Sequence, residues 1–333
     1  MWGLLTAVIL IFCIGIDRTF LVDQGNYLQY FYAAPTLEWI KNLDPRSTPP
    51  MGIVIYLVSG EAVWQVWATL LGWILSPATA VVVTVCLLNL LLALAVLRLP
   101  DPVLPLLIWI IVPVGLAVTG LLQVRQGFAL AVMLYAALRL NRPVAGTLVA
   151  TLIHTTFAIT LPFALIAWLC GRRQTLALML TILLAVAAAY AGGVLFEAFG
   201  GRRLATYAVG ETEATSILYV FGALLCSAPS LHRLFAGYPS AEMTVKGRSL
   251  ALLAIMHLGV IAFCVASFFV FPLGAGRAGY FITLLLIPLL PTIRWRGSVS
   301  GSVIFAVMVL FLVYLLVRTS LDDAGIYDIY FAG

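Results

Sequence analysis

The chain has 333 residues, of which 63% are hydrophobic and only 9% are charged. A soluble domain carries about 25% charged residues, so this sequence lacks the polar surface that would cover a water-facing globule. The net charge of +5 is spread along the chain in single residues and pairs, which excludes a nucleic-acid-binding patch. The composition therefore predicts an integral membrane protein.

Apolar segments follow one another along the whole chain. We predict them at 1–16, 49–60, 62–76, 78–97, 102–121, 126–139, 143–155, 157–170, 175–198, 215–228, 248–271, 277–291 and 299–317. About 20 helical residues are needed to cross about 30 Å of hydrocarbon, and several segments are shorter. Short segments must tilt, re-enter or border a water-filled recess, because exposed backbone ends in lipid are costly. We expect an all-α, polytopic protein with about 11 to 13 transmembrane or re-entrant helices around an outward-facing polar cavity.

Two longer polar stretches interrupt this pattern. The first, 17–48, contains QYFYAAPTLEWIKNL, whose aromatic residues suit an interfacial helix. The second is 199–214. The segment 1–16 lacks the basic start and the cleavage site of a signal peptide, so it should remain as the first helix. No internal repeat or separate soluble domain is visible, so residues 1–333 are expected to form a single integral membrane domain.

The distribution of Lys and Arg predicts the orientation. If the N-terminus is cytoplasmic, the cytoplasmic loops gather ten Lys/Arg against three Asp/Glu, and the other side gathers eight against ten. Cytoplasmic loops carry an excess of Lys and Arg, so the C-terminus and both polar stretches should face outward. This count places Glu61 on the cytoplasmic side. It also requires that 143–170 be divided into two helices at His154-Thr155-Thr156.

Three residues stand out as candidates for chemistry. Arg125 follows a long apolar helix at an outward turn, where a guanidinium next to a membrane cavity would match a phosphate or diphosphate. Arg277 is a second outward cation, preceded by two glycines in PLGAGRAGYF. His154 interrupts an apolar run at the same outward level and is either a hydrogen-bonded packing residue or a general base.

The first outward loop, the cysteines and the known sequence motifs give weaker indications of function. The first outward loop offers Asp17, Arg18, Asp23, Asn26 and Tyr27, which are either solvated or part of a site. The five cysteines lie in apolar stretches without metal-ligand spacing, so no disulfide framework and no zinc site is predicted. No nucleotide-binding or metal-binding motif occurs, and we expect a protein without metal or cofactor.

These elements occur in a recognisable order. After the first apolar segment come an Arg, an Asp and then a Tyr. The sequence VRQGFAL begins a later segment, another segment ends in His-Thr, and an Arg-x-x-Tyr motif lies near the C-terminal end. This order resembles the EpsG family of exopolysaccharide polymerases, related to Wzy-type polymerases, over nearly the whole chain. The matching positions are Arg18, Asp23, Tyr27, Arg125, Gln126, His154, Thr155, Tyr207, Arg277, Tyr280 and Tyr330.

The resemblance implies a glycosyltransferase that joins undecaprenyl-diphosphate-linked repeat units at the periplasmic face of the bacterial inner membrane. Membrane lipids would surround it, with a chain-length regulator and a flippase as candidate partners and no role for nucleic acid. Arg125 and Arg277 would stabilise the departing diphosphate, and His154, or else Asp23, would accept the proton of the attacking hydroxyl. Further contacts with diphosphate or glycan are expected from Gln126, Arg18, Tyr27, Tyr207 and Tyr280.

Two other readings stay open. One is a GT-C type glycosyltransferase that uses a polyprenyl-phosphate sugar, with Asp17 or Asp23 as the base, or an O-antigen ligase. The other is a flippase or another transporter of lipid-linked glycans, whose site would lie near the midplane between paired broken helices. The candidate residues gather toward one face of the membrane, which favours the polymerase.

Overall fold

The computed structural model describes residues 1–16, 23–43, 49–112, 114–199, 217–235, 245–270, 272–293 and 299–322. Every regular element among these residues is a helix, which confirms the all-helical class. The chain divides into two compact units, one formed by 1–158 with 315–333 and the other by 159–314. The prediction of a single membrane domain stays a prediction.

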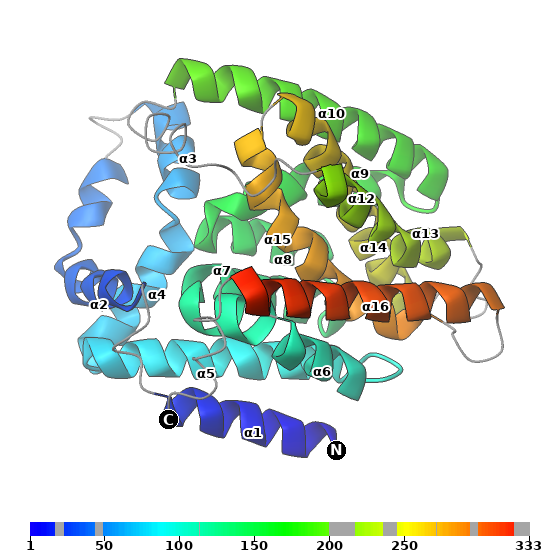
Figure 1. The fold of residues 1–333 in the computed structure, drawn as a ribbon. Coiled ribbons are helices and arrows are strands. Elements are labelled where there is room, and N and C mark those ends of the chain that lie inside the picture. Colours follow the sequence, from blue (N-terminus) through cyan, green and yellow to red (C-terminus); the bar gives the residue numbers. More distant parts are fainter. Residues whose placement is uncertain are drawn as a thin grey trace. The chain divides into compact units, whose positions relative to one another are not determined.

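The first unit contains eight α-helices and several short helical turns within its described residues (Figure 1). They are α1 (Trp2–Gly15), α2 (Gln24–Ala33), η1 (Ala34–Thr36), η2 (Glu38–Leu43), α3 (Pro50–Ser59), α4 (Ala62–Ile74), α5 (Pro77–Val96), α6 (Val103–Ile111), η3 (Val114–Leu122), α7 (Val124–Leu138), α8 (Pro143–Ile153) and the start of η4 (Thr155–Ile159).

Helix α5 is the core of this unit and packs against α1, α2 and α7. It begins sharply because Ser76 accepts a hydrogen bond from the Thr79 amide at 3.3 Å and Pro77 occupies the first turn. Asn89 is buried in its middle, where its carbonyl oxygen accepts a hydrogen bond of 2.8 Å from Trp109 Nε1 of α6. A polar group in an apolar interior is costly unless it is paired, so this bond fixes α6 against α5.

The apolar run 102–121 was expected to form one long helix, and the structure corrects this. It contains α6 and the π-helix η3, which are bent by 73° relative to each other. The sequence has Pro113 at this point, which cannot donate a helical hydrogen bond, and Gly115 has non-helical angles of φ −73° and ψ −111°. Short, irregular η3 therefore precedes α7.

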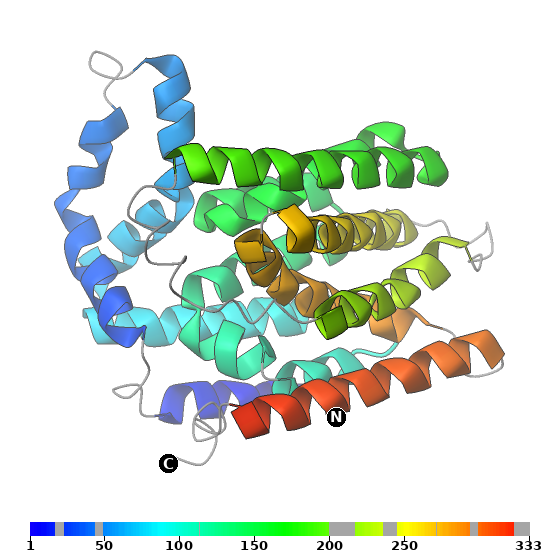
Figure 2. The same ribbon diagram turned by 45° about the horizontal axis from the view of Figure 1, so that its top comes forward.

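The second unit contains α9 (Thr160–Cys170), α10 (Gln174–Phe199), α12 (Ile217–Leu225), α13 (Ser227–Phe235), α14 (Val245–Val270), α15 (Pro272–Leu289), η7 (Leu290–Thr292) and most of α16 (Val299–Asp322). Helix α14 contacts α9, α10 and α15, and its course beside α10 is visible in Figure 2. The buried His257 of α14 is hydrogen-bonded to Ser230 at 2.7 Å and to the Ile282 carbonyl at 3.0 Å, so it joins α13, α14 and α15 as a packing residue.

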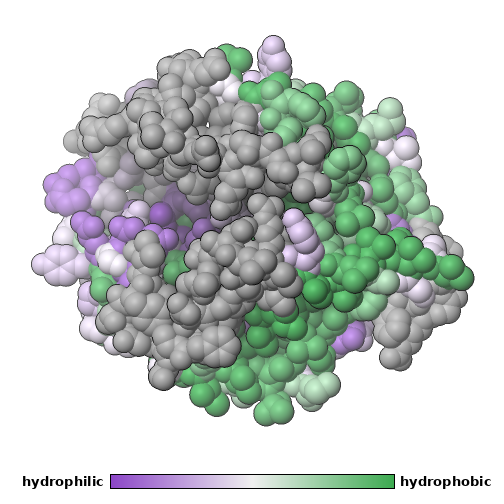
Figure 3. All heavy atoms as spheres, viewed as in Figure 1, coloured by the Kyte–Doolittle hydropathy of each residue, from purple (hydrophilic) through white to green (hydrophobic). Residues whose placement is uncertain are grey.

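Within the described residues, three helices are long and apolar enough to cross a membrane: α5 and the apolar parts of α10 and α14. The number rises to five if α3–α4 and α6–η3 each count as one bent span. This supports a helical membrane protein, and the 11 to 13 crossing or re-entrant helices stay a prediction. Figure 3 shows mainly hydrophobic side chains along α1, whereas hydrophilic side chains gather beside α2.

Candidate active site

The break between α3 and α4 carries a buried acidic residue. Glu61 is 6% exposed and has left-handed angles of φ 54° and ψ 56°, which residues with a side chain rarely adopt. The preceding Gly60 has no room for a side chain, because a Cβ there would lie 2.7 Å from the Tyr56 carbonyl oxygen. The two helices are bent by 62° at this point, so the carboxylate is held at a tight, strained corner.

Arg125 lies in the first turn of α7, two residues before a close helix contact. A Cβ at Gly127 would lie only 2.1 Å from the Thr119 carbonyl oxygen, so glycine lets α7 press against η3. This contact fixes the start of α7 and the direction of Arg125. The guanidinium donates a hydrogen bond from Nη1 to Glu61 Oε2 and forms an ion pair with it.

His154 ends α8 in an extended conformation, with φ −149° and ψ 118°. The helix is therefore interrupted where the sequence predicted, and the division of 143–170 at His154 is confirmed. Nδ1 of His154 lies 2.8 Å from Glu61 Oε1, and the same oxygen accepts a hydrogen bond of 3.2 Å from the Thr155 amide. The turn after α8 thus presents both the ring and a backbone N–H to one carboxylate.

The contacts of Glu61 determine which nitrogen of His154 carries the proton. A carboxylate paired with a guanidinium is an acceptor only, so Nδ1 of His154 must donate to it. In the neutral ring, Nε2 is then the nitrogen with a lone pair. Glu61 therefore orients His154 as a hydrogen-bond acceptor or base, in the way that a buried carboxylate orients the histidine of a catalytic triad.

Helix α2 covers the other side of Arg125. The Tyr30 ring lies with its centroid 4.7 Å from the guanidinium carbon, a cation–π contact. Tyr27 is buried, and its ring lies edge-on to Trp64 of α4 with centroids 6.2 Å apart. Burial raises the pKa of Tyr27 to about 12, although the charge of Arg125 acts in the opposite direction. Its hydroxyl therefore stays protonated at neutral pH and remains a donor.

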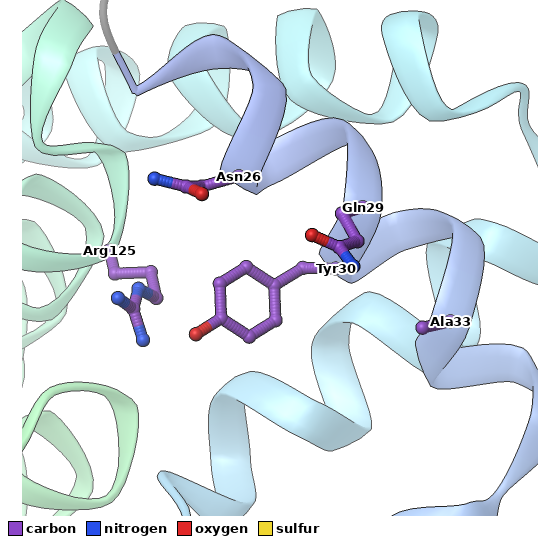
Figure 4. Close-up of a pocket in the computed structure, with 5 residues that line it drawn as sticks. All are labelled: Asn26, Gln29, Tyr30, Ala33 and Arg125. Carbon is purple, nitrogen blue, oxygen red and sulfur yellow. The ribbon is translucent and has the colours of Figure 1, made fainter.

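A pocket of about 450 Å³ opens between α2 and Arg125. Its lining residues are shown in Figure 4: Asn26, Gln29, Tyr30 and Ala33 from α2, and Arg125 from α7. The Tyr30 hydroxyl points toward the guanidinium. Arg125 thus reaches the pocket on one side and the Glu61–His154 pair on the other.

The structure brings some of the predicted site residues together. Arg125 and His154 meet through Glu61, and Tyr27 lies close to Arg125. Gln126 is buried in α7, and Asp23 immediately precedes α2. Proton acceptance by Asp23 stays a prediction.

The remaining candidates belong to the second unit or lie outside the described residues. Tyr280 is half-buried in α15 of the second unit, and Arg277 belongs to the same helix, with its side chain outside the described residues. Asp17, Arg18, Tyr207 and Tyr330 also lie outside the described residues.

Sequence reasoning missed Glu61 and Tyr30 as site residues. The count of loop charges puts Glu61 on the side opposite to Arg125 and His154, and this separation is wrong because Glu61 contacts both. The count treated 49–60 and 62–76 as two separate crossings, whereas α3 and α4 form one bent pair. The available indication was a lone carboxylate between two apolar runs, which in a membrane protein is by default a functional residue.

The described residues contain no group of three or more His, Cys, Asp or Glu side chains that could hold a metal ion. What they do contain is a cation, a carboxylate and an imidazole in direct contact, next to a polar pocket. This set can bind an anion, accept a proton and hold a polar ligand.

Comparison with known proteins gives one match. The family model described as "EpsG family" matches residues 2–330, nearly the whole chain. No curated protein and no solved structure matches the chain significantly.

Proposed function

The chain belongs to the EpsG family, and this membership supports a general function as a polysaccharide polymerase. We propose that it joins repeat units carried on a lipid diphosphate. The carrier is undecaprenyl diphosphate, and the reaction takes place at the periplasmic face of the bacterial inner membrane. The observation that carries the proposal is the contact of Arg125, Glu61 and His154 beside a polar pocket.

Arg125 binds the diphosphate. Glu61 accepts from Nη1 of Arg125, and a guanidinium has five N–H donors, so donors remain for a ligand in the pocket that Arg125 lines. A guanidinium presents N–H groups in a planar fork that matches two phosphate oxygens. When the bond between the anomeric carbon and the diphosphate breaks, the electron pair stays on the diphosphate, and Arg125 stabilises this charge.

His154 accepts the proton. A hydroxyl of the second lipid-linked glycan attacks the anomeric carbon, and its proton moves to Nε2 of His154 while the new C–O bond forms. Glu61 stabilises the imidazolium that results and keeps Nδ1 protonated. The buried, ionised Glu61 does not touch the substrate in this scheme and is a positioning residue.

The site faces outward in this proposal, within a cavity between short and broken helices. The charges in the loops after α4 support this orientation. Their division between the two sides is the same whether α3 and α4 cross the membrane separately or as one bent pair. Ten Lys/Arg and two Asp/Glu fall on one side of these loops, and five Lys/Arg and six Asp/Glu fall on the side of Arg125 and His154. The positive-inside rule then assigns the first set to the cytoplasm.

The test uses purified protein reconstituted right-side-out in proteoliposomes without a membrane potential. Short-chain lipid-linked repeat units are added to the outside, and the products are separated on a gel. A polymerase produces a ladder. Movement of unchanged substrate to the inner leaflet without a ladder would contradict the proposal and support a transporter.

Two variants test whether formation of the ladder depends on Arg125 and His154. Arg125→Lys keeps the charge but loses the planar fork, and should leave a small fraction of the activity. His154→Gln can still hydrogen-bond but cannot accept a proton, and should stop elongation so that single repeat units remain. Full activity of both variants at matched reconstitution would refute the assigned roles.

A further inference from the structure

One face of α2 has no part in the chemistry described above. Asn26, Gln29, Tyr30 and Ala33 are spaced i, i+3, i+4 and i+7, so they lie along one side of the helix. All four line the pocket of about 450 Å³. Tyr27 and Phe31 on the adjoining side are buried, and both of them and Tyr30 contact Trp64 edge-on, whereas Asn26 and Gln29 stay exposed at the pocket.

The lining indicates the chemical class of the ligand. The two amide side chains each provide a donor and an acceptor, which suits sugar hydroxyl or acetamido groups, since these also donate and accept. Among the described residues that line the pocket, Arg125 is the only charged one, and it is already shared with Glu61. The volume lies within the range of about 300–1,000 Å³ that is usual for small-molecule sites.

The Asn26 amide is hydrogen-bonded to the residue that precedes α2. Asn26 Nδ2 lies 3.3 Å from Asp23 Oδ1 and donates to it, so the Asn26 carbonyl oxygen remains as an acceptor for a ligand. This contact gives Asp23 a positioning role on the glycan side of Arg125. Asn26 and Gln29 are both exposed, so replacing them removes no buried packing.

We propose that this pocket binds an uncharged sugar residue, the one bonded directly to the lipid diphosphate, and that Asn26 and Gln29 determine its specificity. The assignment rests on the proposed function, because Arg125 lines the pocket and is the residue that would hold the diphosphate. A sugar attached to that diphosphate reaches the α2 face, while its anomeric carbon, which is bonded to a diphosphate oxygen, stays next to Arg125.

The experiment compares binding of two lipids to the full-length protein in nanodiscs. One is the lipid-linked repeat unit extracted from a producing strain that lacks this protein, and the other is the same lipid diphosphate without sugar. The double variant Asn26→Ala/Gln29→Ala should weaken binding of the glycosylated lipid by about tenfold, as expected for the loss of two hydrogen bonds. Binding of the sugar-free lipid should not change.

Gln24→Ala is the matched control. It removes the same kind of amide from the same helix, and Gln24 does not line the pocket. It should leave binding of both lipids unchanged. Equal weakening of both lipids by the double variant, or no weakening of either, would overturn the sugar subsite even if the wild type makes a ladder. Absence of any binding of either lipid to the wild type would instead refute the proposed function.

Discussion

The arrangement of the site depends on one carboxylate that accepts hydrogen bonds from two side chains and one backbone amide. Glu61 contacts Arg125 through one oxygen, and His154 and the Thr155 amide through the other. Residues from three separate segments of the chain are therefore connected through a carboxylate that is only 6% exposed. Its left-handed backbone costs energy, and such strain is found where the surrounding structure requires an unusual direction of the side chain.

We predict that Glu61→Gln lowers the kcat of polymerisation on the order of 100-fold without raising KM. Glutamine can still accept from the Thr155 amide and from His154, so the fold should persist, but it cannot stabilise an imidazolium. Steady-state kinetics on purified protein measures both constants. Glu61→Asp keeps the charge and should recover part of kcat. An increase of KM with an unchanged kcat would show that Glu61 acts in binding instead.

At the residue scale, the sequence predicted Arg125, His154 and Tyr27 from residue type and local context. It could not predict Glu61 as their partner, because a sequence shows that a carboxylate lies between two apolar runs but not which helix ends it meets. Tyr30 was assigned to the membrane interface for the same reason. Its contact with Arg125 depends on how α2 packs against α4 and α5, which is a tertiary property.

At the scale of elements, close helix contacts place the site. The start of α7 is set by Gly127 against η3, and α7 and α8 approach closely at Gly146, where a Cβ would lie 2.5 Å from Ala136 Cβ. Small residues permit such approaches between membrane helices. These two contacts bring α7 close to η3 and α8, while Glu61 orients the side chains of Arg125 and His154.

Gly127 is not a site residue, but Gly127→Ala should disrupt the site by displacing the start of α7. The added methyl group meets the backbone of Thr119, which cannot move aside as a flexible side chain would. We expect a stability loss of about 1–3 kcal/mol from overpacking, and a loss of polymerising activity that exceeds it because Arg125 is displaced. Thermal unfolding and gel assays measure the two effects. Gly3→Ala in α1 adds a methyl group with nothing within 4 Å, and alanine favours the helix, so this variant should lower neither stability nor activity. If Gly127→Ala keeps the stability and activity of the Gly3→Ala variant, the close contact of α7 with η3 does not position Arg125.

Element boundaries were predicted well where hydropathy changes sharply. Helices α1, α5, α8 and α10 begin and end close to the predicted limits. The helix predicted at the membrane interface begins earlier than its aromatic cluster suggested, at Gln24, and ends at Ala33. Hydropathy could not reveal the bends in α3–α4 and α6–η3, because an apolar run has the same average whether it is straight or broken.

At the scale of the whole molecule, composition was sufficient for the helical membrane class, and the order of motifs was sufficient for the family. The orientation rests on loop charges and stays a prediction. The assumption that each apolar run crosses the membrane separately put Glu61 on the side opposite to its partners, and this separation is wrong.

We predict that polymerisation is independent of metal ions. Purified protein with lipid-linked substrate in detergent should form the same ladder with and without excess chelator, because the guanidinium of Arg125 stabilises the departing charge in the proposed mechanism. Product length and initial rate are measured in both conditions. Loss of activity on chelation that magnesium or manganese restores would contradict this.

The Arg125–Glu61 ion pair has a consequence for turnover. The cation already has an anionic partner, so in the proposed mechanism an incoming diphosphate meets a guanidinium whose charge is largely neutralised by a carboxylate. After transfer, the spent carrier lipid is held by the same weakened attraction and leaves more readily. A polymerase that must release one carrier for every repeat unit it adds gains from such a neighbouring carboxylate, because an unpaired cation would hold the product diphosphate more tightly.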